Sequence, residues 1–198
     1  MSKTQKRGDE RRKRILDAAL ALVGAGGVEA VTMSATSKKS GVPTGSLYQY
    51  FPERNAILIA LAEREFLRLR DLARAGRGDI ETLADLRCAA ETTMKLMAKV
   101  MRAEPGLRFL WSGMDANPDF SHQFSAVTQA FSAVFAERLK PFSPDMAAED
   151  RMRLAALIVT TLKSTSIAAA AMPEREADAF VADATEMIWR RIVDQLAT

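Results

Sequence analysis

The chain has 198 residues, of which 48% are hydrophobic and 27% carry a charge. This balance is typical of soluble globular domains and excludes a chain that is disordered throughout. No apolar run approaches the ~18–20 residues that span a membrane as a helix, and no signal-peptide core follows the charged N-terminus. Because Cys88 is the single cysteine, a disulfide framework is excluded and we expect a cytoplasmic protein.

Charge is divided unevenly along the chain. Residues 1–78 hold 15 Lys and Arg against 8 Asp and Glu, a net charge of +7, whereas residues 79–198 hold 13 against 17, a net charge of −4. Seven of the basic residues lie between Lys3 and Arg14. A basic front part favours a polyanion as partner, with salt-dependent binding. For residues 1–13 taken alone, the alternative is a solvated, disordered tail.

Apolar residues recur every three or four positions from Ile15 to Val23, which predicts a first helix. A cluster of three glycines follows and ends this helix. Thr32 is a suitable N-cap for a second, short helix that runs to about Ser40. This second helix is polar and poor in strong helix formers, so we expect it to be only weakly stable on its own.

A turn and two further helices follow directly. Gly41 suits the left-handed residue that closes a helix, and Pro43 suits the first turn of the next one. That third helix is about two turns long, because Pro52 stops it. A fourth helix begins near Glu53, and its apolar stripe continues to Leu69.

The segment from Ala75 to Asp79, which contains two glycines, is the best candidate for a boundary. Beyond it, helical periodicity is interrupted at Pro105-Gly106, Asn117-Pro118, Pro141 and Pro173. The helices predicted between these breaks cover 83–101, 120–135, 154–172 and 180–196, with a short aromatic segment near 109–111. No useful strand alternation or internal repeat is present. The predicted class is therefore all-α, with about nine helices.

The short second helix, the glycine turn and the short third helix together form the pattern of a helix-turn-helix. Several residues in this region follow one another at a characteristic spacing: Ile15-Leu16-Asp17-Ala18-Ala19, Thr32, Gly41-Val42, Gly45, Leu47-Tyr48, Tyr50-Phe51, Arg54, Ala56 and Leu58. From about Arg14 to Leu61 the chain thereby resembles the N-terminal domain of the TetR family of bacterial transcriptional regulators. The resemblance implies a DNA-binding domain over 14–75 and a regulatory and dimerisation domain over 79–198.

Leu47 and Phe51 lie four residues apart and should share the buried face of the third helix, which leaves its other side chains free to reach DNA. Gln49 could pair with an adenine edge. By resemblance, the base-edge and groove contacts are Thr44, Gly45, Ser46, Tyr48 and Gln49, and the phosphate contacts are Ser34, Tyr50 and Arg54. For both tyrosines the alternative is a side chain in or near the core.

Two positions depart from the family pattern. Thr36 occupies a position that is usually aliphatic, and a buried threonine there needs a hydrogen bond, for example to the carbonyl four residues back. Glu53 stands where the family often has a better capping residue, and its charge would oppose a nearby phosphate. We therefore expect a less stable second helix, with the motif retained.

The last two predicted helices are the usual dimerisation pair of this family. The first of them is rich in small residues, which permit close helix packing across a four-helix interface: Ala155, Ala156, Thr160, Thr161, Ser164, Thr165, Ala168 and Ala169. The alternative is an ordinary intramolecular core, which must hold for at least one face of each helix. A dimer would also match a palindromic DNA operator.

Soft and aromatic side chains gather in the middle of the back half. They suggest an apolar site for a small hydrophobic or aromatic effector, although a stripe of this kind is more often plain core. The candidate residues are Met94, Met97, Met101, Phe109, Trp111, Phe120, His122, Phe124 and Thr161.

The leading hypothesis is a ligand-responsive DNA-binding regulator, most often a repressor in this family, which binds double-stranded DNA as a homodimer. An enzyme is not expected, because the sequence has one histidine, one cysteine and no metal-ligand cluster, phosphate loop or nucleophile elbow. No cofactor or membrane partner is implied. The alternative is a helical ligand-binding or interaction dimer without specific DNA recognition.

Overall fold

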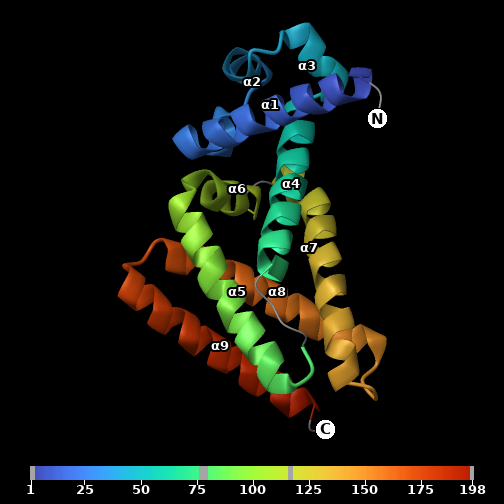
Figure 1. Cartoon of the computed structure of the whole chain (residues 1–198), viewed down its shortest axis with the longest axis vertical. Helices are drawn as coiled ribbons and strands as arrows, with labels where there is room; N and C mark the ends of the chain where they lie inside the picture. Colours follow the sequence, from blue (N-terminus) through green and yellow to red (C-terminus); the bar gives the residue numbers. More distant parts are fainter. Residues whose placement is uncertain (1–2, 76–79, 116–117, 197–198) are drawn as a thin grey trace. The chain divides into compact units, whose positions relative to one another are not determined.

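A computed structural model of the chain describes residues 3–75, 80–115 and 118–196 (Figure 1). Throughout these ranges the regular secondary structure is helical, which confirms the all-α prediction. The α-helices are α1 (Lys3–Gly26), α2 (Met33–Ser40), α3 (Thr44–Tyr50), α4 (Arg54–Ala75), α5 (Leu83–Ala103), α6 (Pro105–Asp115), α7 (Pro118–Leu139), α8 (Ala148–Ala170) and α9 (Glu174–Leu196), with short 3-10 turns η1 (Val28–Ala30) and η2 (Lys140–Phe142).

The chain divides into two compact units, each of which consists of two separate segments of the sequence. Unit 1 consists of Met1–Arg68 and Glu104–Phe124, and unit 2 consists of Leu69–Ala103 and Ser125–Thr198. Unit 1 therefore includes α6, which the sequence placed with the back half. Of the boundary expected at 75–79, residues 76–79 lie outside the described part of the chain.

Unit 1 is organised around α1. Ile15, Leu16, Ala19 and Val23 form its buried stripe, and each is at most 2% exposed. The helix extends back to Lys3, so the basic segment is helical from that residue on, where a disordered tail had been the alternative. The reason is continuity: this segment adds turns to a helix that tertiary packing has already nucleated, which removes the main cost of helix formation.

Helix α6 packs very closely against α1 and η1. A Cβ built on Gly106 would lie 2.8 Å from the Leu20 carbonyl oxygen, and one built on Gly113 would lie 2.8 Å from Cγ1 of Val28. A side chain at either glycine would therefore force α6 away, from α1 at Gly106 and from η1 at Gly113. Pro105-Gly106 had been expected only to end the preceding helix, whereas Pro105 opens α6 and Gly106 lies inside it.

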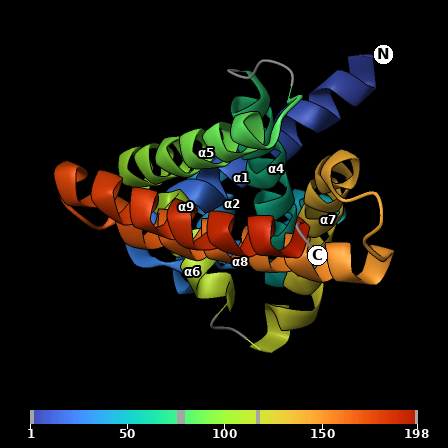
Figure 2. The same cartoon turned by 90° about the horizontal axis from the view of Figure 1, so that it is seen from below.

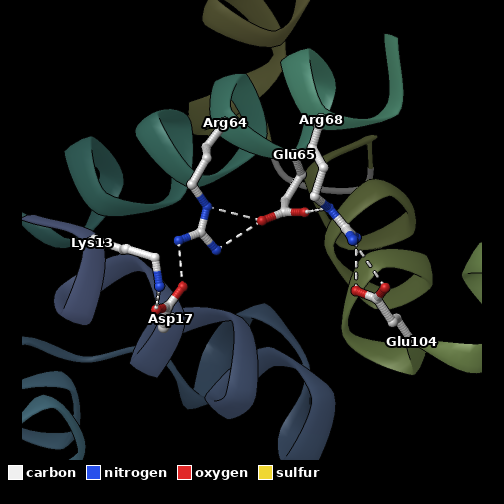
Figure 3. A network of polar contacts seen from close by, with 6 residues as sticks. All are labelled: Lys13, Asp17, Arg64, Glu65, Arg68 and Glu104. Atoms are coloured by element: carbon white, nitrogen blue, oxygen red, sulfur yellow. Dashed lines mark hydrogen bonds and ion pairs between the residues drawn. The ribbon is translucent and has the colours of Figure 1, made fainter. Parts of the chain in front are cut away.

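Within unit 1, ion pairs connect α4 to α1 and to Glu104, the residue directly before α6 (Figure 3). Glu65 is 2% exposed and accepts from Arg64 Nε at 2.9 Å and Arg68 Nε at 2.7 Å. Arg64 also pairs with Asp17 of α1 at 2.6 Å, and Arg68 forms a two-pronged contact with Glu104 at 2.7 and 3.0 Å. The buried carboxylate is thus flanked by two cations, which is what a charge removed from water requires.

These contacts change the proton affinities of the groups involved. Partial burial alone would raise the pKa of Asp17, but hydrogen bonds from Lys13 and Arg64 outweigh it and hold the pKa below its ordinary value. The hydrogen bonds to Glu104 raise the pKa of Arg68. Both groups therefore stay charged at neutral pH, as the network requires.

Unit 2 is built from α5, α8 and α9 with the later part of α7, and Figure 2 shows α5, α8 and α9 side by side. Met94, Ala155, Ile158 and Val181 are among its most buried residues. Arg102 of α5 donates from Nη2 to the carbonyl oxygen of Ala169, near the end of α8, at 2.9 Å and to that of Met172, just beyond the helix, at 3.0 Å.

Helix α8 is the central helix of unit 2. It is long and apolar enough, by length and composition, to span a membrane, with a mean hydropathy of 1.2 over its most apolar 18-residue window. A core helix of a soluble domain has the same composition when one face is buried, and its residues Leu154, Ala155, Ile158 and Leu162 belong to the core of unit 2.

The Gly106 contact gives a direct test of how α6 packs. We expect Gly106→Ala to lower the free energy of unfolding by about 1–3 kcal/mol, because the added methyl group meets the α1 backbone and not a flexible side chain. Gly8→Ala is the matched control: it also lies in a helix, but a methyl group added there would have no atom within 4 Å, and stability should stay equal or rise. Urea denaturation of both variants measures this, and equal stabilities would contradict the close packing.

Candidate nucleic-acid interface

The helix-turn-helix is formed by α2, the turn at 41–43 and α3. Thr32 is the N-cap of α2 and its hydroxyl accepts from the Ala35 backbone N–H at 3.0 Å. Gly41 closes the helix in the left-handed region, at φ 67°, where residues other than glycine are strained. Both of these sequence predictions are confirmed.

Polar side chains of α2 stabilise the turn. The Ser37 hydroxyl donates to the Val42 carbonyl oxygen at 2.7 Å and accepts from the Thr44 hydroxyl at 3.0 Å. The Val42 backbone N–H donates to the Ser40 hydroxyl at 3.2 Å. The polar character of α2, which looked unfavourable in the sequence, thus supplies the hydrogen bonds of the turn. Sequence reasoning missed this role, although two serines shortly before a glycine turn are a usable signal.

Thr36 departs from expectation. It is 0% exposed, as predicted for the position, but its hydroxyl has no hydrogen-bond partner among the described residues. The expected bond to the carbonyl of Thr32 is not made by the side chain; that carbonyl accepts from the Thr36 backbone N–H at 2.9 Å. An unsatisfied buried hydroxyl costs about 1–3 kcal/mol, so α2 carries a local penalty.

Helix α3 has one buried and one exposed face. Leu47 is 0% exposed and Phe51, its C-cap, is 3% exposed, which confirms the predicted packing face. The guanidinium of Arg12 on α1 lies 5.5 Å from the centre of the Phe51 ring and connects the end of α3 to the basic part of α1. Tyr48 is the most exposed large apolar side chain of the motif, at 52%.

The predicted contact residues fall into three groups. On α3, four are exposed and suitably placed to meet a ligand: Thr44, Gly45, Tyr48 and Gln49. Ser34 is exposed in the first turn of α2, whereas Ser46 and Tyr50 are half-buried. Arg54 alone turns inward: its Nε donates to the Val31 carbonyl oxygen at 2.8 Å and its Nη2 donates to that of Val28 at 2.9 Å.

The residues predicted to bind an effector are divided between the two compact units. Met94, Met97, Met101 and Thr161 belong to unit 2, whereas Phe109 and Trp111 belong to unit 1. The Thr161 hydroxyl donates to the Leu157 carbonyl oxygen. Phe109 is 39% exposed, with the Arg108 guanidinium over its ring. The side chains of Phe120, His122 and Phe124 lie outside the described part of the chain.

Unit 2 contains a small apolar cavity of about 20 Å³ between α5, α7, α8 and α9. Of the predicted effector residues, Met94 lines it. The other walls include Phe135, Ile158 and Trp189, and Thr185 supplies a hydroxyl that donates to the Val181 carbonyl oxygen. A cavity of this size holds about one water molecule, so a larger ligand requires these helices to separate.

Models of known families match both parts of the chain. Residues 15–61 match the model described as bacterial regulatory proteins, tetR family, and residues 85–190 match tetracyclin repressor-like, C-terminal domain. The first range spans the buried stripe of α1, the helix-turn-helix and the start of α4. The chain belongs to the TetR family. It is therefore a transcriptional regulator with a helix-turn-helix DNA-binding domain, and the sequence-based prediction of the family is confirmed.

Two curated relatives are transcriptional repressors, and one of them matches most of this chain. The HTH-type transcriptional repressor KstR of Rhodococcus jostii (strain RHA1) is 30% identical over 163 residues, which cover 80% of this chain and 72% of that protein. KstR of Mycolicibacterium smegmatis is 50% identical over 60 residues, which cover 30% of this chain and 29% of that protein.

Solved structures share the fold at lower identity. Salmonella enterica GusR matches with a TM-score of 0.70 and 16% identity, and the match covers 96% of both chains. FadR of Bacillus subtilis, solved in complex with stearoyl-CoA, matches with a TM-score of 0.56 and 16% identity over 92% of this chain and 98% of its own. At such identities the likeness shows the fold alone.

The unsatisfied hydroxyl of Thr36 predicts a stabilising substitution. Thr36→Val keeps the shape and removes the hydroxyl, so we expect the free energy of unfolding to rise by about 1 kcal/mol. Ser37→Ala, one residue along the same helix, is the control; it removes two hydrogen bonds of the turn and should lower stability by a similar amount. Urea denaturation decides the matter, and a less stable Thr36→Val would show that the hydroxyl is satisfied in solution.

Proposed function

We propose that this TetR-family regulator is a repressor, which binds a palindromic operator as a homodimer and releases it on binding a small hydrophobic molecule. The observation that carries the proposal is the exposed face of α3, which follows a turn held by the Thr32 cap of α2, by Gly41 and by the hydrogen bonds of Ser37 and Ser40. The KstR relatives, which are repressors, support the direction of regulation.

The DNA contacts that we propose come from the exposed side chains of the motif. Tyr48 and Gln49 offer an aromatic ring and an amide at the centre of α3, and Gly45 lets that helix approach the groove floor closely. Thr44 contributes through its methyl group, because its hydroxyl is already bonded to Ser37. Ser46 and Tyr50, both half-buried, would meet the groove edge and a phosphate, respectively.

The N-terminal turns of α1 add a charge-based contact. Arg7, Arg11 and Arg14 are exposed and, at spacings of four and three residues, share one side of the helix. A helical stripe of cations is suited to phosphates along the DNA backbone, because it presents its charges at fixed intervals. This geometry favours the backbone over insertion into the minor groove.

The dimer that we propose uses the outward faces of α8 and α9. Leu157 is 53%, Phe180 38% and Met187 74% exposed. Exposed apolar side chains that gather on neighbouring helices, as on α8 and α9, are candidates for a protein–protein interface. On α8, Thr160 and Ser164 are exposed beside Leu157, so small side chains surround the apolar one. This pattern fits the small-residue surface expected of a closely packed four-helix interface.

The effector site that we propose is the apolar cavity of unit 2. Its walls, which include Met94, Phe135 and Trp189, offer almost exclusively apolar side chains, and such walls select hydrophobic or aromatic ligands. The structurally similar FadR, solved with stearoyl-CoA, supports a ligand with an apolar chain. Ligand binding would favour a conformation in which the two α3 helices no longer match the spacing of the operator.

Specific DNA binding can be tested on α3. We expect the double substitution Tyr48→Ala with Gln49→Ala to weaken binding to a duplex selected by the wild-type protein by about 2 kcal/mol or more, roughly thirtyfold, because two groove contacts are lost. Glu63→Gln, an exposed position on α4, is the control and should bind as the wild type does. Fluorescence anisotropy at two salt concentrations measures both. Selection that enriches no sequence, or binding that ignores salt, would favour an interaction dimer without DNA recognition.

The interface can be tested separately from DNA. We expect Met187→Asp and Leu157→Asp to convert the dimer to monomers, because each buries an unpaired charge in the proposed interface. Met152→Asp is the matched control: Met152 is also on α8 and 40% exposed, but its place in the helical repeat puts it on a different side from Leu157. Light scattering after size exclusion gives the masses, and a monomeric wild type would contradict the proposed assembly.

A further inference from the structure

Arg54 connects the start of α4 to the turn that leads into the helix-turn-helix. Its Nε donates to the Val31 carbonyl oxygen at 2.8 Å, and its Nη2 donates to the Val28 carbonyl oxygen at 2.9 Å. The same Nη2 pairs with Glu29 Oε2 at 2.9 Å. All three partners belong to η1 or to its C-cap Val31. The two carbonyl bonds join Arg54 to residues that lie 23 and 26 positions earlier in the chain.

The carbonyl oxygens that Arg54 binds lie in the short segment that leads directly into α2. Val31 is 0% exposed and directly precedes Thr32, the N-cap of α2. The Val28 carbonyl oxygen accepts the Val31 backbone N–H at 3.2 Å as well as the arginine. The direction in which α2 leaves the turn is therefore determined by the backbone segment that the guanidinium holds.

We propose that Arg54 is a positioning residue for DNA recognition, which sets the orientation of α2 and through it α3, and that it does not contact a phosphate. This inference rests on the proposed DNA-binding function. The planar guanidinium carries five N–H donors in a fixed plane. Three of these donors, those of Nε and Nη2, are engaged within the protein. The guanidinium therefore cannot reorient toward a phosphate without breaking the bonds to η1, and the same bonds fix the direction of its two Nη1 donors.

The substitution Arg54→Lys separates the two roles. A lysine keeps the charge, so a phosphate contact would be largely retained, but a single ammonium group cannot replace the forked contact to two carbonyl oxygens. For a positioning role we expect Arg54→Lys and Arg54→Ala both to weaken binding to the selected duplex by about tenfold or more, as expected for the loss of a charge-assisted hydrogen bond. Glu29→Gln is the control: it leaves both carbonyl bonds in place and should bind as the wild type does.

Three measurements make the test decisive. Binding to a random-sequence duplex should stay within about twofold of wild type, whereas a merely less stable protein would lose both affinities together. The slope of log affinity against log salt should stay unchanged, whereas a lost phosphate contact would lower it by about 0.9 per contact. Amide hydrogen exchange should become faster in residues 28–36 of both Arg54 variants, relative to the rest of unit 1.

The proposal is overturned if Arg54→Lys binds the selected duplex like the wild type. It is also overturned if Arg54→Ala lowers the salt slope by about 0.9 for each Arg54 in the bound protein, or if hydrogen exchange in residues 28–36 is unchanged in both variants. A wild-type protein that selects no duplex would instead overturn the proposed function. In that case the exchange measurement alone still decides whether Arg54 holds η1 and α2.

Discussion

Helix α1 must cover its apolar surface from two directions, and the arrangement of unit 1 depends on this requirement. Its stripe of Ile15, Leu16, Ala19 and Val23 is fully buried, with α2 in contact on one part of its surface and α6 on another. Such a helix fixes the distance and angle between its neighbours, because packed interiors have little free volume. The helix-turn-helix is therefore mounted on a helix that cannot shift independently of α6.

Charge reinforces this arrangement at the contact between α4 and its neighbours. Glu65 is buried between Arg64 and Arg68, and each arginine reaches a second carboxylate, one on α1 and one at the start of α6. Hydrophobic contacts are tolerant of small sliding movements, whereas a buried carboxylate that is paired with two arginines is satisfied only within a narrow range of geometries. The network therefore gives unit 1 a defined register, which apolar packing alone specifies less sharply.

Local signals in the sequence were sufficient to predict the helix-turn-helix, but not the long-range contacts that hold it in place. The Thr32 cap, the Gly41 turn and the Leu47 and Phe51 face follow from short-range rules, and all were predictable. The inward turn of Arg54 was not, because its partners are more than 20 residues away in the chain. The effector residues stay a prediction: an apolar stripe in the sequence does not say to which of the two units each residue belongs, and Met94 and Phe109 belong to different ones.

The two-segment composition of unit 1 has a consequence for how the protein folds. The backbone of α1 at Gly24 meets that of α6 at Gly106, so forming this contact closes a loop of about 80 residues, an entropic cost that grows with loop length. During synthesis the chain emerges from its N-terminus, and one flank of α1 stays uncovered until α6 has been made. The final packing of α1, α2 and α3 thus depends on a long-range contact, and such contacts form more slowly than local ones. It is complete only after α6, in the middle of the chain, has been made.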